Sequence, residues 1–512
     1  MRLADLVAGL SRLADLGFGL PAGQSLRSAA LAAVLGRQLG LPDADVQAGL
    51  FTALLFHVGC VGYAHETAAL FGDEFVTQLA GEQTNPAEVG EVVDMLAGLV
   101  RGRPPREAAR VAVTTVTRAT QIGRAYSTAS CEVGRDAARR LGLPAGVQHS
   151  VYHAAEWWNG KGAPDRLAGN DIPVGARLAT LAATTVLFDT IGGVEVAVDA
   201  VRRRKGGILD PHLTEGLAER ARPLFAEVDA ADPYLLVLEV EPRPVAWVPD
   251  PQLVEVATVF GDLADLKTPF MYGHARGVAT LARDAGRRLG VGAAELDELE
   301  VAGFLHDVGR VAISASVWEK PGPLSAHEWE QVRLHPYHSE RILAGSQLLA
   351  RLAPLVGAHH ERSDGSGYHR GSPATELSMP ARVLAAADVY QAMTQPRPHR
   401  PALAREQAQQ QLAGDARTGA LDAEAVSAVL AAAGHDTVVR RELPAALTDR
   451  EVQVLRLVAE GCTNARIAER LVISRRTAEY HVQQIYRKIG VSSRAAAAMF
   501  AMEHHLLEHQ DR

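Results

Sequence analysis

GQSLRSAALAAVLGRQLGLPDADVQAGLFTALLFHVGCVG (residues 23–62) aligns without a gap with GHARGVATLARDAGRRLGVGAAELDELEVAGFLHDVGRVA (residues 273–312). Apolar residues recur in the second stretch with the 3.6-residue period of a helix, which predicts helices over residues 275–289 and 296–306. Because the first stretch keeps the same spacing, it predicts helices at the matching positions. The repeated pattern therefore fixes the fold class of this region as all-α.

Two shorter matches continue the repeat. HAAEWWNGKGAP from His153 resembles AHHERSDGSGYH from Ala358, and GARLATLAAT from Gly175 resembles PARVLAAADV from Pro380. Since the matches keep their order along the chain, the sequence predicts two similar helical domains in tandem.

The polar positions of the repeat distinguish the two copies. The second copy carries, in order, His274, His306, Asp307, His359, His360 and Asp388. The first copy carries, in the same order, Gln24, Phe56, His57, Ala154, Ala155 and Ala183. Imidazole nitrogens and carboxylate oxygens are ligands for divalent transition metals. We therefore expect a metal site in the second copy and a degenerate first copy that keeps only the fold.

Two stretches interrupt the helical pattern. EPRPVAWVPDP at residues 241–251 holds four prolines in eleven residues and cannot continue a helix. A second break precedes a new helical pattern that starts near residue 447. A chain of 512 residues is long enough for about three domains. We expect domains and linkers with these limits: domains at 1–240, 252–435 and 447–512, and linkers at 241–251 and 436–446.

Composition narrows the protein class. Hydrophobic residues make up 47% and charged residues 22% of the chain, as in ordinary globular proteins. The three cysteines form no CxxC pair, which excludes a disulfide scaffold and a thiolate zinc site and fits a reducing cytoplasm. No run of about 18 apolar residues suggests a membrane span, and charges interrupt the N-terminal apolar pattern. The sequence predicts a cytoplasmic protein without a membrane partner.

Five ordered blocks of the second copy resemble an HD-GYP domain over roughly residues 263–434. The blocks are HDVGR from His306, KPGPLS from Lys320, HP from His335, HHERSDGSGY from His359 and ADVYQAMTQPRPHR from Ala387. The resemblance implies an all-α HD fold, a non-haem iron or manganese centre and hydrolysis of cyclic di-GMP or a related nucleotide phosphodiester.

The resemblance also implies roles for particular residues. It gives as metal ligands His274, His306, Asp307, His335, His359, His360 and Asp388. Some family members carry a glutamate four residues before the first histidine and bind three metals. Phe270 holds that position here, which favours two divalent metals. Asp307 would bridge the two ions.

Substrate contacts follow from the same resemblance. Arg310 stands where the family usually has a lysine that contacts phosphate, and an arginine can make that contact in bidentate form. We expect Asp307 and Arg310 to carry catalysis. The signature loop would line the substrate mouth with Asp364, Gly365, Gly367 and Tyr368.

A different class of function stays open. His369 replaces the proline of the GYP signature, and Gln391 stands where an aspartate is common. With these departures, the metal site could serve a non-enzymatic nucleotide or metal sensor whose HD domains control dimerisation and DNA binding.

The C-terminal region carries a third pattern, LTDREVQVLRLVAEGCTNARIAERLVISRRTAEYHVQQIYRKIGVSSR, from Leu447 to Arg494. Thr448 and Glu451 form a capping box for a first helix, Thr463 or Asn464 caps a short second helix, and Ser474 caps a third. The region holds eight arginines and one lysine against five acidic residues, inside a chain whose net charge is −8. A basic module with this helix order suits the major groove of DNA.

This region resembles the LuxR/NarL-type helix-turn-helix, which implies a four-helix domain that binds double-stranded DNA as a homodimer. The resemblance places Glu479, Tyr480 and Gln483 at base-reading positions. The expected phosphate contacts are Arg475, Arg476, Thr477, Arg487, Lys488 and Arg494. The whole chain is then predicted to be a bacterial transcription regulator that carries a nucleotide phosphodiesterase domain.

Overall fold

The protein is helical throughout, as the sequence predicts. The computed structural model describes residues 1–248, 252–435, 444–491, 493–504 and 506, and those residues contain no β-strand. Residues 249–251 of the first predicted linker and residues 436–443 of the second lie outside the described residues.

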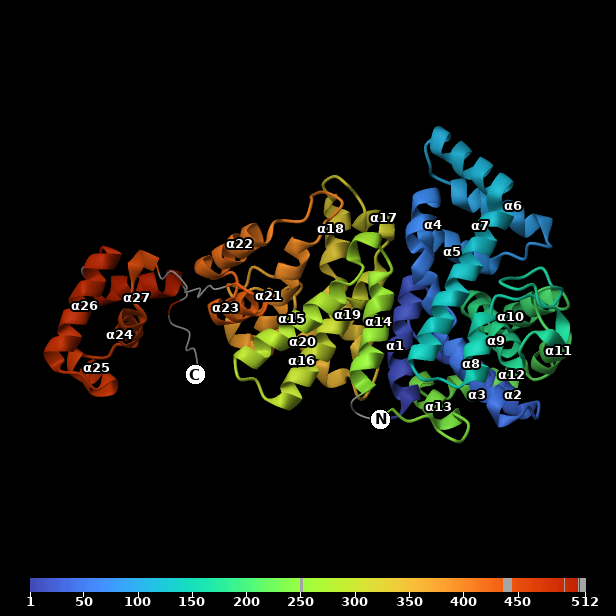
Figure 1. Ribbon diagram of the computed structural model, residues 1–512, viewed down its shortest axis with the longest axis horizontal. Helices are drawn as coiled ribbons and strands as arrows, with labels where there is room; N and C mark the ends of the chain where they lie inside the picture. The colour runs from blue at the N-terminus through green and yellow to red at the C-terminus, as the bar shows by residue number, and fades with distance from the viewer. Residues whose placement is uncertain (249–251, 436–443, 492, 505, 507–512) are drawn as a thin grey trace.

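The first copy of the repeat holds thirteen of the helices (Figure 1). They are α1 (Leu3–Phe18), α2 (Gln24–Gln38), α3 (Asp43–Leu55), α4 (Ala64–Phe71), α5 (Glu74–Gln83), α6 (Val89–Val100), α7 (Pro105–Arg140), α8 (Ala145–Tyr152), α9 (Val174–Gly192), α10 (Val194–Arg204), α11 (Pro211–Ala218), α12 (Ala221–Asp229) and α13 (Pro233–Val240). Two short 3₁₀ segments join them, η1 (Val58–Tyr63) and η2 (Gly169–Asp171).

The second copy is more compact in sequence. Its helices are α14 (Leu253–Asp265), α15 (His274–Arg288), α16 (Ala293–Leu305), α17 (Ala315–Trp318), α18 (Ala326–Arg333), α19 (His335–Leu343), α20 (Ala353–Gly357), α21 (Met379–Thr394), α22 (Arg405–Thr418) and α23 (Ala423–Ala432). Its 3₁₀ segments are η4 (Pro269–Met271), η5 (Val308–Ala312), η6 (Ala350–Leu352) and η7 (Ala374–Glu376).

The structure confirms the repeat and extends it to the first helix of each copy. The pairs α1/α14, α2/α15 and α3/α16 begin 250 residues apart, at residues 3/253, 24/274 and 43/293. Each copy starts its second helix in the same way. Gly23 and Gly273 have positive φ angles of 96° and 77°, where an L-residue would be strained. A buried carboxylate then accepts backbone hydrogen bonds at the start of that helix. Asp15 accepts from the amides of Gly23 and Ser25 in the first copy, and Asp265 accepts from the amide of Ala275 in the second.

The two copies pack into one body with one continuous hydrophobic core. Helix α1 of the first copy lies against η5 and α19 of the second copy, and α14 lies against η1 of the first (Figure 1). The contact is close because α1 presents glycine to it. A Cβ at Gly9 would lie 2.3 Å from the Cβ of Ser346, and a Cβ at Gly17 would touch both Val61 and Val311.

The proline-rich segment is held against the N-terminus. The amide of Val248 donates to the carbonyl of Met1 (2.7 Å), and the amide of Leu3 donates to the carbonyl of Ala246 (2.9 Å). Arg2 also pairs with the buried carboxylate of Glu241 at 2.6 Å. The described part of this predicted linker therefore belongs to the packed body.

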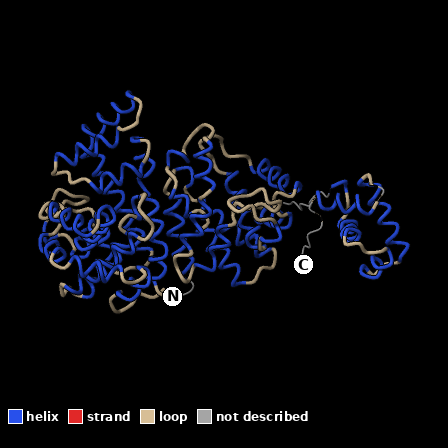
Figure 2. Tube along the Cα trace, turned by 180° about the vertical axis from the view of Figure 1, so that it is seen from behind, coloured by secondary structure: helices blue, strands red, loops and turns tan. Residues whose placement is uncertain are grey.

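The C-terminal module has its own small core. It consists of η8 (Pro444–Ala446), α24 (Asp449–Ala459), α25 (Asn464–Leu471), α26 (Arg475–Ile489) and α27 (Arg494–Glu503). Its buried apolar residues form a cluster separate from the main core, and the module stands at one end of the molecule in both views (Figure 2). The capping box of Thr448 and Glu451 forms as predicted, and Thr463 caps α25.

Two stretches are long and apolar enough to cross a membrane, Asp43–Phe71 and Val174–Gly192. Burial explains their composition, since 78% and 56% of their most apolar windows lie inside the protein. Helices α3 and α9, which form much of these stretches, pack against each other in the core.

Candidate functional site

The fold brings all seven candidate ligands together at one point of the second copy. His274 begins α15, His306 follows the end of α16, Asp307 precedes η5, and His335 begins α19. His359 and His360 follow α20, and Asp388 lies within α21. Three sets have ligand atoms within 4.8 Å of one another: His335 with His359 and His360, His274 with His306 and Asp388, and His306 with Asp307 and His359.

Backbone carbonyls hold three of the imidazoles in the same way. Nδ1 of His306 lies 2.7 Å from the carbonyl oxygen of Gly303, three residues earlier. His335 and His359 make the same contact with the carbonyls three residues before them, at 2.6 and 2.7 Å. A carbonyl only accepts, so each Nδ1 carries a proton, and in the neutral form of each ring Nε2 keeps a free lone pair. The first histidine is held from a side chain instead, because Nδ1 of His274 faces Oε1 of Gln395 at 2.8 Å.

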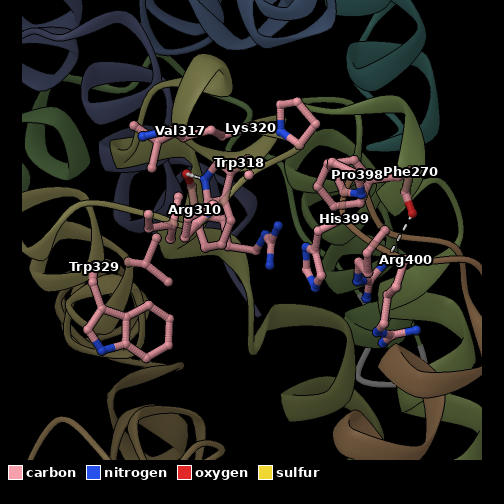
Figure 3. A pocket seen from close by; sticks show the side chains of 15 residues that line it. Phe270, Arg310, Val317, Trp318, Lys320, Trp329, Pro398, His399 and Arg400 are labelled. Carbon is pink, nitrogen blue, oxygen red and sulfur yellow. Dashed lines mark hydrogen bonds between the residues drawn. The ribbon is translucent and has the colours of Figure 1, made fainter.

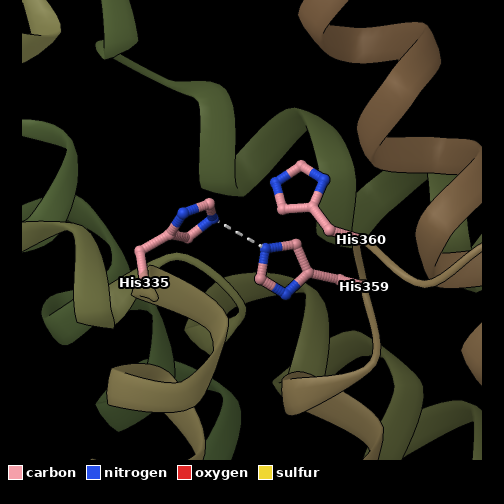
Figure 4. Close-up of side chains that lie close together, drawn as sticks. All are labelled: His335, His359 and His360. Carbon is pink, nitrogen blue, oxygen red and sulfur yellow. Dashed lines mark hydrogen bonds between the residues drawn. The ribbon is translucent and has the colours of Figure 1, made fainter. Parts of the chain in front are cut away.

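The free lone pairs point at one another. Nε2 of His335 lies 3.1 Å from Nε2 of His359 (Figure 4). Two lone pairs at this distance repel unless a cation lies beside them. Nε2 of His306 and Oδ1 of Asp307 are buried without a hydrogen bond. This donor set, made of imidazole nitrogens and carboxylate oxygens, fits a transition metal.

Asp307 divides the ligands into two groups. Its Oδ1 lies 3.2 Å from Nε2 of His335 and 3.5 Å from Nε2 of His359. Its Oδ2 lies 3.4 Å from Nε2 of His306 and 3.7 Å from Nε2 of His274. One carboxylate therefore faces two neighbouring clusters of histidines, one with each oxygen.

Electrostatics keep the two carboxylates of the site ionised and favour positive charge beside them. Burial opposes ionisation of Asp307 and Asp388, but the neighbouring histidines, with Arg310 beside Asp307, outweigh it and hold the pKa of both carboxyls well below the usual range. Burial lowers the pKa of His335 to about 4, so its imidazole is neutral at pH 7. Burial also acts against a charged His306, yet the two carboxylates outweigh it and raise the pKa of His306 well above its usual value. The site thus attracts positive charge.

A cavity of about 690 Å³ is lined by Arg310, which reaches Asp307, and by none of the seven candidate ligands themselves. Arg310 reaches into it, with its guanidinium carbon 3.6 Å from the ring centre of Trp318 and one nitrogen 3.6 Å from Oδ2 of Asp307 (Figure 3). This places one fixed positive charge between the ligand cluster and the cavity, as the sequence suggests for Arg310.

Several cavity residues have no counterpart among the predicted site residues. The walls also contain Phe270, Lys320, Trp329, Arg397, His399 and Arg400. Lys320 pairs with Glu328 at 2.7 Å, and burial lowers the pKa of Arg397 to about 10. Arg400 donates to the carbonyls of Ala392 and Met393 at the end of α21. The KPGP and QPRPHR blocks were the only sequence signals for these groups.

The signature loop contributes one residue to the site. The ring of Tyr368 stacks on His360 with the ring centres 4.7 Å apart. Asp364 is exposed and accepts the amide of Ser366, and it does not line the cavity. Gly365 and Gly367 do not line the cavity either.

The two glycines shape the loop. Gly365 has a φ of 77°, and a Cβ at Gly367 would lie 2.4 Å from the amide nitrogen of Arg362. The first copy repeats this arrangement at Gly162, where a Cβ would lie 2.3 Å from the amide nitrogen of Trp157. Because the degenerate copy keeps the glycine, Gly367 supports the loop backbone rather than a reaction.

The first copy lacks the ligand cluster. All the groups of described residues close enough to hold a metal lie in the second copy. His57, at the position of Asp307, has a buried Nδ1 without a hydrogen bond, and burial lowers its pKa to about 3. Nε2 of His153 lies 3.0 Å from Oδ2 of Asp165.

The C-terminal module exposes most of the residues predicted to contact DNA. Arg475, Arg476, Thr477, Glu479, Tyr480, Gln483 and Arg487 lie exposed along α26, while Ala478, Val482 and Ile485 are buried. Nζ of Lys488 is held by Glu451 (2.7 Å) and the carbonyl of Ala446 (2.9 Å), so it fastens α26 to α24. Arg494 begins α27, and its side chain lies outside the described residues.

Both the second helical copy and the C-terminal module are similar to known protein families. Residues 258–425 match the family model of the HD domain, and residues 445–501 match that of bacterial regulatory proteins of the luxR family. The 3′3′-cGAMP-specific phosphodiesterase 3 of Vibrio cholerae is 29% identical over 409 residues, which cover 78% of this chain and 88% of the relative. A cyclic di-GMP phosphodiesterase of Pseudomonas aeruginosa is 36% identical over 141 residues, 27% of this chain and 34% of that protein.

A solved structure matches most of the chain. The crystal structure of a cyclic GMP-AMP specific phosphodiesterase of V. cholerae superimposes with a TM-score of 0.58 at 25% sequence identity. The match covers 85% of this chain and 98% of the solved one. The tandem arrangement of two helical copies is therefore shared with that structure.

Proposed function

Since residues 258–425 form an HD domain and residues 445–501 a domain of the luxR family, we propose that the chain is a transcription regulator fused to a metal-dependent phosphodiesterase that hydrolyses a cyclic dinucleotide. The observation that carries the proposal is the convergence of seven histidine and aspartate ligands beside a cavity that holds arginine and tryptophan. The similarity to cyclic di-GMP and cGAMP phosphodiesterases supports the reaction class.

The ligand geometry supports two metal positions occupied by iron or manganese. His335, His359 and His360 would hold one ion, and His274, His306 and Asp388 the other. Asp307 would bridge them, since its two oxygens face the two clusters. When bound, such ions supply Lewis-acid activation of water and neutralise charge on the phosphoryl oxygens.

The remaining residues bind and orient the substrate. Arg310 would bind the phosphate that is cleaved, because its guanidinium is fixed by Trp318 within reach of the ligand cluster. A cyclic dinucleotide carries a second phosphate and two bases. Arg397 offers a second cation in the same cavity, and Trp329 offers a ring on which a base can stack.

The C-terminal module would bind double-stranded DNA through α26. The exposed polar face of this helix and its two leading arginines support that role. A homodimer would place two such helices about one helical turn of DNA apart.

Metal analysis and a hydrolysis assay test the enzyme. We would purify the full chain without oxygen, measure its metal content, and assay cyclic di-GMP and 3′3′-cGAMP with the wild type, Asp307→Asn and the control Asp297→Asn. Asp297 is an exposed surface aspartate that pairs with Arg283. We expect the wild type and the control to bind about two iron or manganese ions and to hydrolyse substrate. We expect Asp307→Asn to show lower metal content and lower hydrolysis.

The other outcomes are equally informative. Metal without hydrolysis of either substrate would contradict the enzyme and favour the sensor, in which site occupancy changes DNA affinity. A protein without metal would contradict both readings of the site.

A further inference from the structure

The first copy holds a cavity where the second copy holds its ligand cluster. The cavity has a volume of about 360 Å³ and is lined by Phe56, Ala154 and Ala155. These residues align with His306, His359 and His360. The loss of the imidazoles thus coincides with an internal space at the same place in the fold.

Longer helices surround this space in the first copy. Between η1 and α8 the first copy carries α4 to α7, including the 36-residue helix α7, where the second copy carries the shorter helices α17 to α19 between η5 and α20. Gln78 of α5, Met95 of α6 and Ile122 of α7 line the cavity. The first copy therefore has longer helices around the place where it lacks the metal ligands.

Polar side chains without partners face this cavity. Thr52 is fully buried and Gln78 is 6% exposed, and neither the Thr52 hydroxyl nor either polar atom of the Gln78 amide makes a hydrogen bond in the protein. The hydroxyls of Tyr126 and Ser130 also line the cavity, where they lie close to each other and to the thiol of Cys60. A buried polar group without a partner is costly, so the Thr52 hydroxyl and the Gln78 amide need donors and acceptors from a molecule inside the cavity.

The charges around the cavity do not favour an ionic ligand. Arg204 is 2% exposed, and its guanidinium is already held by Glu91 at 3.0 Å and by the carbonyl of Gln83 at 2.7 Å. Burial raises the pKa of Glu82 to about 7, so this carboxyl loses much of its charge at neutral pH. Most of the other lining is apolar, as with Leu55, Phe71 and Leu99.

We propose that this cavity binds a small, neutral, mainly apolar molecule whose hydroxyl or carbonyl group bonds to Gln78 and Thr52. A volume of about 360 Å³ would hold about twelve water molecules at ~30 Å³ each, which suits a ligand with about a dozen non-hydrogen atoms. This site lies outside the metal centre and does not depend on the proposed phosphodiesterase activity.

The cavity is linked to the second copy through one helix. Gln78 lies on α5, and Glu74 at the start of α5 is fully buried. Its carboxylate pairs with Lys267 at 2.6 Å and accepts the amide of Ala315 at 2.9 Å, just beyond η5. A ligand that shifts α5 would therefore also act on the segment that follows Arg310.

Fluorescence binding to the full-length protein tests the proposal. The neutral dye N-phenyl-1-naphthylamine is the probe, with wild type, Ala155→Phe and the control Ala125→Phe. Ala125 is exposed on α7 and does not line the cavity. A ring at Ala155 fits the fold, because the second copy carries His360 there. We expect one dye per chain, at least tenfold weaker binding in Ala155→Phe, and unchanged binding in the control.

Displacement of the dye tests the ligand class. Decanol is expected to displace it at lower concentration than decanoate does at pH 8, and Gln78→Leu is expected to weaken decanol binding about threefold to tenfold, the effect of one hydrogen bond. Absence of dye binding, equal binding by Ala155→Phe, or equal displacement by decanoate would overturn the proposal. Circular dichroism of each variant confirms that it is folded.

Discussion

Buried carboxylates begin the second helix of both copies, and the one in the first copy makes stability depend on pH. Asp15 is fully buried, and its carboxylate accepts the amides of Gly23 and Ser25 and the hydroxyl of Ser25. Burial outweighs these hydrogen bonds and raises the pKa of Asp15 to about 6. An unfolded aspartate has a pKa of about 3.9. The folded protein therefore binds this proton more tightly than the unfolded chain does.

The sign of the pH effect follows from linkage. Because the pKa of Asp15 is raised on folding, its contribution to stability is complete below about pH 4 and is lost as the pH rises through about 6. We expect the free energy of unfolding of the wild type to fall by up to about 3 kcal/mol relative to Asp15→Asn between pH 4 and 7. Urea unfolding of both proteins across this range measures it. A constant difference between them would contradict the shifted pKa.

Two glycines at equivalent positions of the two copies distinguish support of the loop backbone from an effect on the metal site. A Cβ at Gly367 or at Gly162 would collide with backbone nitrogen at 2.4 or 2.3 Å, so alanine should destabilise either loop by about 1–3 kcal/mol. Only Gly367 precedes Tyr368, whose ring stacks on His360. We expect Gly367→Ala to lower metal content and hydrolysis and Gly162→Ala to lower thermal stability alone. Equal loss of metal in both variants would contradict this assignment.

At the scale of the element, α26 exposes one residue that we expect to recognise the base sequence and another that we expect to bind the DNA backbone whatever the sequence. Gln483 and Arg487 are both exposed on it, one turn apart. Gln483→Ala should relax the sequence preference, while Arg487→Ala should weaken binding to all sequences and lower the salt dependence of the affinity by about one ion. Binding titrations at several salt concentrations measure both effects.

The control for the DNA-binding experiment is an exposed arginine outside the C-terminal module. Arg139 lies exposed on α7 of the first copy and pairs with Asp136, so Arg139→Ala should leave DNA affinity unchanged. If Gln483→Ala keeps the sequence preference of the wild type among DNA sites, the base-reading role of Gln483 is contradicted. We expect Lys488→Ala to act through stability, since its ammonium fastens α26 to Glu451 of α24.

At the scale of the whole molecule, one buried ion pair joins the two copies. Nζ of Lys267 lies 2.6 Å from Glu74, and the two side chains are 2% and 0% exposed. Lys267 also donates to the carbonyl of Val311 at 3.0 Å. Burial lowers the pKa of Lys267 and the charge of Glu74 opposes that shift. Removal of one partner would leave the other as an unpaired buried charge.

The ion pair predicts a strong coupling energy. Glu74→Gln and Lys267→Met should each lower the free energy of unfolding by about 3–5 kcal/mol, and the double variant should lose less than the sum of the two. The exposed pair of Arg139 and Asp136 is the control, and Arg139→Met should cost less than about 1 kcal/mol. Additive losses in the buried pair would mean that the two copies do not share this contact.

Much of the fold and part of the site could be predicted from the sequence. Helical periods, the repeat at residues 23–62 and 273–312, and the capping box of Thr448 and Glu451 depend on residues near one another in the chain. The types and order of the seven candidate ligands could be predicted because several of them are adjacent in the sequence, such as His306 and Asp307. The exposed face of α26 also followed from the spacing of Ala478, Val482 and Ile485.

Tertiary structure alone decided which distant groups meet. Arg397 lines the cavity beside Arg310, Gln395 orients His274, and Glu74 of the first copy reaches Lys267 of the second only because helices far apart in the chain pack together. Packing also left the space around Gln78, which is lined by alanines and by helices α4 to α7. The sequence by itself determined the helices, the repeat and the ligand types, because local spacing encodes them. The structure determined the convergence of those ligands and the first-copy cavity, because both depend on contacts across the shared core.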